Sequence, residues 1–361
     1  MKKIGSSTIR SCRVDIMRAD LVQPFRTALG EHRSLENLIF KIVLADKTVG
    51  LGEAAVATHI SGESFQDTHT QLQQAAAMLQ GRDVTNCAAI SRDMHEAFST
   101  SPSVLAAVET AVMDAVARHR KIPLWRLFGR RCRLLQTDIT IVIADLKETE
   151  ASVKRFYRQG FRAFKVKVGQ DFDLDVKRMA LTARVARNSS LILDANQGYN
   201  AKEMLAFLKE MEKADVKIDL IEQPVPRSDW EGLKRVTRAT DIPVCADESV
   251  RTWEDAQRAI KEKAVDAINI KIMKHGLLGA HRIAQLARRS KMSLMIGGMM
   301  ETSLAMTASA HLAAGMGCFS YIDLDTPFFI KNEPVRGGGL SRRGVYDLSK
   351  IRSGIGVSIN R

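Results

Sequence analysis

The feature that most constrains the fold is a repeat of strands and helices that runs from about residue 134 to residue 325. Short apolar segments begin 23 to 29 residues apart, and amphipathic stretches of helical length separate them. Strands that alternate with helices indicate βαβ units and a parallel sheet. Eight such strands are the number that closes a (β/α)8-type barrel. The expected strands are 137–143, 163–168, 191–195, 220–224, 243–248, 267–272, 293–298 and 321–324.

An open, doubly wound parallel sheet is the competing interpretation of this repeat. Such a sheet typically carries a glycine-rich phosphate-binding loop directly after an early strand. The sequence has no loop of that kind there, so the barrel is favoured.

The first part of the chain has a different pattern. Residues 9–21 and 37–54 indicate antiparallel strands, and residues 63–80, 83–100 and 104–120 indicate helices. We therefore expect three parts, which are an α+β capping domain over 1–125, a barrel catalytic domain over 126–330 and a C-terminal segment over 331–361 that packs back on the capping domain.

Composition narrows the class of protein. The 361 residues are 45% hydrophobic and 26% charged, which is typical of a folded chain and not of a disordered one. No apolar run reaches the roughly 18 residues that a membrane-spanning helix needs, so we expect no membrane partner. The five cysteines form no CxxC pair, which indicates reduced thiols and a cytoplasmic protein.

The net charge of +13 raises a non-enzyme alternative, a basic nucleic-acid-binding protein on a degenerate barrel. The densest basic run lies within residues 118–133, where it is interleaved with an apolar helix and a glycine turn. Stacking aromatic residues do not accompany it as they do in many nucleic-acid sites. We interpret this run as a solvated face and expect no nucleic-acid partner.

Carboxylates follow three consecutive strands of the expected barrel. Asp194, Glu222 and Asp247 are spaced by 28 and 25 residues, which is one βα unit each. Catalytic groups of such barrels project from the C-terminal strand ends, so the three should converge. A single Asp after a strand is commonly a helix cap, but three in register weaken that interpretation. Three oxygen donors without histidine or cysteine predict a hard cation, Mg²⁺.

Lysines lie on two strands of the same barrel. Lys165 and Lys167 are two residues apart, so both point to one face, which we expect to be the inside. Two neighbouring ammonium groups near a cation disfavour each other's charge, so we expect a lowered lysine pKa that makes a neutral lysine available as a base. Lys271 is on the sixth strand, opposite the second, so Lys167 and Lys271 would face a substrate carbon from both sides. Lys274 is expected to be its solvated neighbour.

Five segments carry a resemblance to a known family. KVKVG (165–169), DANQGY (194–199), IEQP (221–224), ADES (246–249) and NIKIMK (269–274) closely resemble the muconate-lactonising branch of the enolase superfamily. The resemblance spans nearly the whole chain, from PFRTALG (24–30) onward.

The resemblance implies roles for these residues. Lys167 and Lys271 would be the acid/base pair and Lys165 an auxiliary lysine, while one Mg²⁺ per subunit would be held by the three carboxylates. A proton next to a carboxylate is weakly acidic, and the cation with a nearby ammonium group would stabilise the resulting enediolate. The supporting residues near this site would be Asn196, Glu248 and Glu301.

The DLD motif (323–325) indicates the reaction within the branch. Its two carboxylates would share one face at the barrel mouth and suit a free ammonium group, and the motif looks like the DxD feature of dipeptide epimerases. An ordinary strand-end turn before Pro327 is the alternative. The stretch IGGMMET (296–302) also resembles that family. The expected substrate-binding residues are Asp323, Asp325, Gly298, Met299, Gly30, Glu31 and Thr140.

One departure from the family bears on the substrate. Relatives that act on Ala-Glu dipeptides carry an arginine near the end of the first capping loop, where this chain has Gly30. That departure argues against Ala-Glu as the substrate. The acidic residues Glu31 and Glu63 suggest a dipeptide with a cationic side chain instead.

The leading hypothesis is a Mg²⁺-dependent dipeptide epimerase that inverts the α-carbon of the C-terminal residue by 1,1-proton transfer. The enzyme alternatives are a muconate cycloisomerase and an o-succinylbenzoate synthase of the same branch, whose substrates carry no amine. A mandelate-like racemase is less favoured, because that group uses a histidine dyad where this chain has Lys271. We expect a homo-oligomer that acts on a small-molecule dipeptide.

Overall fold

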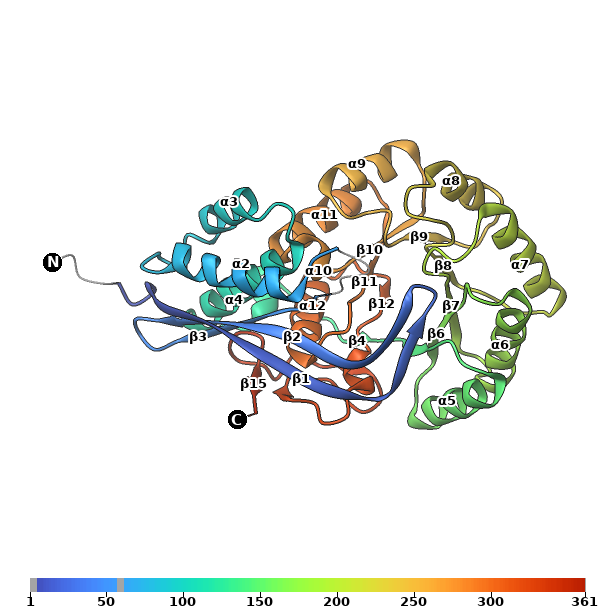
Figure 1. Ribbon diagram of the computed structural model, residues 1–361, viewed down its shortest axis with the longest axis horizontal. Coiled ribbons are helices and arrows are strands. Elements are labelled where there is room, and N and C mark those ends of the chain that lie inside the picture. Colours follow the sequence, from blue (N-terminus) through green and yellow to red (C-terminus); the bar gives the residue numbers. More distant parts are fainter. Residues whose placement is uncertain (1–4, 57–61, 361) are drawn as a thin grey trace.

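The computed structural model describes residues 5–56 and 62–360. Its N-terminal strands form an antiparallel sheet in the order β1-β2-β3. β1 and β2 make a long hairpin whose tip crosses to the barrel, where Ile143 N donates to Arg26 O at 3.2 Å (Figure 1). The bounds of these strands are Ile9–Thr27 for β1, Gly30–Leu44 for β2 and Val49–Ala54 for β3.

Three of the described helices accompany this sheet: α2 (Phe65–Leu79), α3 (Cys87–Ala97) and α4 (Pro102–His119). The sequence predicted all three within a few residues. α4 lies directly against β3. The approach is so close that a Cβ atom added at Gly52 would be 1.9 Å from the carbonyl oxygen of Ala107. Glycine in β3 therefore permits a close approach that any side chain would prevent.

The eight predicted barrel strands are all present and parallel. They pair in chain order from β5 to β12, without the reversal of strand order that a doubly wound sheet shows (Figure 1). The first and last strands meet where Asp138 N donates to Ile322 O at 2.9 Å. The strands are β5 (Ile139–Ile141), β6 (Ala163–Lys167), β7 (Ser190–Asp194), β8 (Leu220–Glu222), β9 (Val244–Ala246), β10 (Ala267–Ile270), β11 (Ser293–Ile296) and β12 (Tyr321–Ile322).

Helices connect these strands and cover the outside of the barrel (Figure 1). Side-chain caps such as those of Asp145, Asp171, Asn200 and Thr252 begin several of them by accepting a backbone N–H of the first turn. The helices are α5 (Leu146–Gln159), α6 (Phe172–Val185), α7 (Ala201–Lys213), α8 (Trp230–Arg238), α9 (Trp253–Glu262), α10 (Ile272–His275), α11 (Leu277–Arg289) and α12 (Ser303–Met316).

The C-terminal segment contacts both the N-terminal part and the barrel. Gly354 exchanges backbone hydrogen bonds with Ile122 and Leu124 after α4, and β14 pairs with β4 at the entrance to the barrel. β13 and β15 pair with each other. The short elements are η1 (Leu124–Leu127), β4 (Leu135–Gln136), η2 (Thr326–Phe329), β13 (Val335–Gly337), β14 (Val345–Tyr346) and β15 (Val357–Ile359).

The described helices were also compared with the length and apolarity that a bilayer requires. None of those in residues 5–56 and 62–360 could cross a membrane.

Candidate active site

A pocket lies between the C-terminal ends of the barrel strands and the β1–β2 hairpin. The barrel contributes charged groups to its lining, and the hairpin and the residues after β3 contribute both apolar and polar groups. The charged lining residues are Lys165, Lys167, Asp247, Glu248, Lys271, Asp323 and Asp325 of the barrel and Glu36 of the hairpin, whose carboxylate pairs with Arg18. The apolar lining residues are Phe25, Leu29, Leu35, Ala55, Val56, Met299 and Met300.

The period of two along a strand explains why three carboxylates form one layer, of which Asp247 lines this pocket. Ile192, Leu220 and Cys245 belong to a buried cluster formed by the barrel strands. Asp194, Glu222 and Asp247 each lie two residues further along the same chain segments, so they form the next layer. Asp194 and Glu222 are direct partners in the β7–β8 register.

Each predicted lysine binds carboxylates of this layer. Lys165 Nζ lies 3.0 Å from Asp194, 2.8 Å from Glu222 and 2.7 Å from Asp323. Lys167 Nζ donates to Asp194 Oδ2 at 2.6 Å. Lys271 Nζ lies 2.6 Å from Asp247 Oδ2.

The placement of the two outer lysines is the notable feature of this arrangement. Lys167 ends β6 and Lys271 follows β10, and three strands separate these two in the sheet. Both lysines line the same pocket. They therefore approach the pocket from well-separated strands and rest on different carboxylates.

The expected lowering of lysine pKa is wrong for Lys165. Burial lowers its pKa, but the carboxylates of Asp194, Asp323 and Glu222 outweigh burial and hold that pKa well above its usual value. Burial likewise lowers the pKa of Lys271, but the carboxylate of Asp247 outweighs burial and raises that pKa. Burial raises the pKa of Asp194, but Lys165 and Lys167 overcome this and lower it to about 2. The ion pairs, which sequence spacing does not reveal, decide these directions.

Lys274 was expected to be solvated, and that prediction is wrong. Its side chain is buried and donates to Asp247 Oδ1, Asp247 O and Asn269 O, each at 2.8 Å. α10 is a single turn, so Lys274 folds back beneath the end of β9. Asp247 is thereby held by two lysines.

The surroundings of the three carboxylates fit a hard cation. Asn196 Oδ1, Glu248 Oε2 and Asn269 Oδ1 are buried acceptors to which no described group donates a hydrogen bond. Asn269 Nδ2 donates to Glu222 Oε1 at 2.8 Å, which holds this amide against the carboxylate layer. Buried oxygens without donors are costly unless a cation or another ligand satisfies them. Oxygen donors alone suit Mg²⁺.

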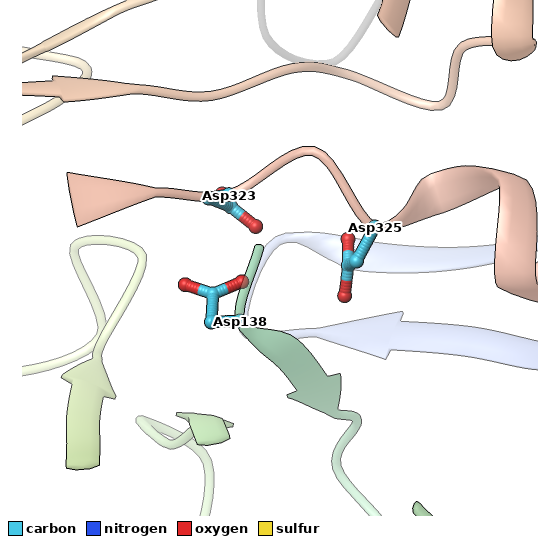
Figure 2. A group of neighbouring side chains, drawn as sticks. All are labelled: Asp138, Asp323 and Asp325. Atoms are coloured by element: carbon cyan, nitrogen blue, oxygen red, sulfur yellow. The ribbon is translucent and has the colours of Figure 1, made fainter. Parts of the chain in front are cut away.

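The DLD residues reach the pocket from the end of β12. Asp323 accepts from Lys165, and Asp325 accepts from the backbone N–H of Thr140 at 2.6 Å. Figure 2 shows Asp138, which directly precedes β5, close to both of them. The sequence interpretation did not single out this residue. It precedes Thr140 by two residues and so shares its face, a signal that the strand pattern contained.

Gly298 and Met299 line the pocket from the loop between β11 and α12. Met299 N donates to Glu301 Oε1 at 2.5 Å, and burial raises the pKa of Glu301 to about 8. The sequence did not indicate Glu53 of β3, which anchors the same loop. Glu53 accepts from Thr302 N at 2.9 Å and from Asn37 at 2.6 Å, so it joins the N-terminal sheet to the start of α12.

Gly30, Glu31 and Glu63 are absent from the described lining of this pocket. The carboxylate of Glu31 pairs with Arg26 at 2.5 Å and with Arg33 at 2.6 Å. Glu63 accepts from Ser103 Oγ at 2.7 Å. The expectation that these acids receive a cationic substrate side chain is therefore not supported by their positions.

Comparison with known families agrees with this fold. Residues 12–129 match the N-terminal domain of mandelate racemase / muconate lactonizing enzyme. Residues 148–361 match the enolase C-terminal domain-like family.

Individual relatives match over nearly the whole chain. The hydrophobic dipeptide epimerase of Citrifermentans bemidjiense is 45% identical over 98% of both chains. The aromatic dipeptide epimerase of Herpetosiphon aurantiacus is 36% identical over 98% of this chain and 99% of its own. A structure of the dipeptide epimerase of Enterococcus faecalis V583 with Mg and the dipeptide L-Leu-L-Tyr superimposes with a TM-score of 0.93 at 31% identity, and covers 97% of this chain and 99% of its own. The chain belongs to the enolase superfamily and, within it, to the dipeptide epimerase family.

Proposed function

We propose that this protein is a Mg²⁺-dependent dipeptide epimerase that inverts the α-carbon of the C-terminal residue by 1,1-proton transfer. The observation that carries the proposal is the pair Lys167 and Lys271, which line one pocket from strands that are separated by three others and rest on different carboxylates. One lysine removes the α-proton as a neutral amine. The other, as an ammonium, delivers a proton to the opposite face of the carbon.

The carboxylate layer supports this transfer. Asp194, Glu222 and Asp247 would hold Mg²⁺, which when bound supplies positive charge beside the substrate carboxylate. Lys165 remains an ammonium because three carboxylates surround it. Its fixed charge offsets the negative charge that develops on the substrate as the α-proton leaves.

The far end of the pocket suits a free amine and an apolar side chain. Asp323 and Asp325 place two carboxylates where the N-terminal ammonium group of a dipeptide would bind, and amine-free substrates give them no role. Phe25, Leu29 and Leu35 of the β1–β2 hairpin add apolar groups to the same lining. No arginine lines the described part of the pocket. We infer a preference for hydrophobic dipeptides over acidic or cationic ones.

The test is a dipeptide library in ²H₂O, read by mass spectrometry. The proposal expects Mg²⁺-dependent incorporation of one deuterium at the α-carbon of the C-terminal residue, fastest with apolar dipeptides. A strong preference for acidic or cationic side chains would contradict the specificity. The absence of incorporation from every dipeptide would contradict the reaction.

A further inference from the structure

Asp138 is a buried acid with no evident counter-charge of its own. It precedes β5, is 2% exposed, and no described group forms a hydrogen bond with either of its carboxylate oxygens. Oxygen atoms of Asp138, Asp323 and Asp325 lie within 4.8 Å of one another, and Figure 2 shows the Asp138 carboxylate directed toward Asp323 with Asp325 to one side. Three ionised carboxylates this close in a buried site would repel one another strongly.

The donors around this cluster are unevenly distributed. Lys165 donates to Asp323 at 2.7 Å, and Thr140 N donates to Asp325 at 2.6 Å. Asp138 receives neither donor, so a proton on its own carboxyl group is the donor that the cluster lacks. Burial, Asp323 and Asp325 all raise the pKa of Asp138, whereas Lys165 opposes them more weakly.

We propose that Asp138 is a neutral carboxylic acid whose hydroxyl donates a hydrogen bond to Asp323. The inference rests on the proposed function, because Asp323 is there a receptor of the substrate ammonium group. Lys165 holds one oxygen of Asp323 from the side of the metal ligands. Asp138 would fix the same carboxylate from its other side, while Asp323 and Asp325 line the pocket.

Asp138 is a positioning residue in this account, because it does not line the described pocket and acts through Asp323. A neutral acid beneath the pair also lowers the repulsion that would otherwise turn Asp323 away. The substrate ammonium group then meets Asp323 and Asp325 in fixed positions.

Two variants of nearly the same size separate this role from a merely structural one. Asp138→Asn keeps a donor, so the KM for an alanyl dipeptide should stay within about threefold of the wild-type value. Asp138→Leu removes the donor, and KM should rise about tenfold or more while kcat changes little, since a lost hydrogen bond to a charged group costs about that much. The N-propionyl analogue of the same substrate lacks the amine, and both variants should leave its binding unchanged.

Infrared difference spectroscopy tests the proton directly and requires no activity. The wild-type spectrum minus that of Asp138→Asn at neutral pH should show the carbonyl stretch of a protonated carboxylic acid. Carboxylate bands in its place would overturn the proposal, as would an equal rise of KM in both variants or no rise in Asp138→Leu. If the acid band is present but no dipeptide is epimerised, the proposed function fails while the protonated Asp138 stands.

Discussion

His311 should make the stability of this protein depend on pH between neutrality and pH 4. The side chain is fully buried in α12. Its Nδ1 accepts from Trp125 N at 3.0 Å, and its Nε2 donates to Ile355 O at 3.0 Å. This ring therefore joins the last barrel helix to η1 and to the C-terminal segment, and it does so only as the neutral tautomer with the proton on Nε2.

The magnitude follows from the pKa of this group. Burial lowers the pKa of His311 from 6.5 to about 4, against a smaller opposing effect of the Ile355 carbonyl. A difference of about 2.5 in pKa corresponds to about 3 kcal/mol, at about 1.4 kcal/mol for each pH unit. The folded state disfavours the protonated ring, so this contribution is complete above pH 6.5 and is lost as the pH falls toward 4.

Denaturant unfolding at a series of pH values measures this effect. The difference in unfolding free energy between wild type and His311→Gln should shrink by about 3 kcal/mol from pH 7 to pH 4, because glutamine does not titrate. Comparison with the variant cancels the carboxylates that titrate in the same range. If the difference in unfolding free energy stays constant from pH 7 to pH 4, the low pKa of His311 does not contribute to stability.

Two further predictions concern the barrel and the metal. Arg178 is buried in α6 and donates to Lys167 O and Val142 O at 2.6 Å and to Asp175 at 3.0 Å. Arg178→Met should therefore lower the free energy of unfolding in urea by about 3–5 kcal/mol, because Asp175 loses its ion-pair partner. The exposed Arg184 of the same helix supplies the control, and an equal small effect of Arg184→Met would show that the buried ion pair is unimportant. Chelation should abolish α-proton exchange and added Mg²⁺ should restore it; exchange that persists in chelator would contradict the metal assignment.

The barrel and its charged layer were predictable because they follow from local periods. Asp194, Glu222 and Asp247 each end or directly follow a short apolar strand, and parallel strands in chain order bring such positions together. Lys167 and Lys271 were placed by the same count of strands. No long-range information was needed beyond the number of strands that closes a barrel.

The remaining features depend on contacts that sequence spacing does not carry. Glu31 was expected to be available to a substrate side chain, but the β1–β2 register places it directly opposite Arg26. Lys274 looked solvated because a single-turn helix is not distinguishable from a longer one in sequence. Glu53 acts on Thr302, which lies 249 residues away. Asp138 precedes its strand and resembles an ordinary turn residue until its neighbours are known.

Stereospecific exchange of the α-proton tests whether Lys167 and Lys271 act from opposite faces of the substrate carbon. Lys167→Ala and Lys271→Ala would each be incubated in ²H₂O with the two epimers of a preferred dipeptide, and α-proton exchange would be followed separately for each epimer. We predict that each variant loses α-proton exchange with one epimer and retains it with the other. The epimer that is lost should differ between the two variants. Loss of the same epimer in both variants, or normal exchange of both epimers, would contradict two lysines acting from opposite faces.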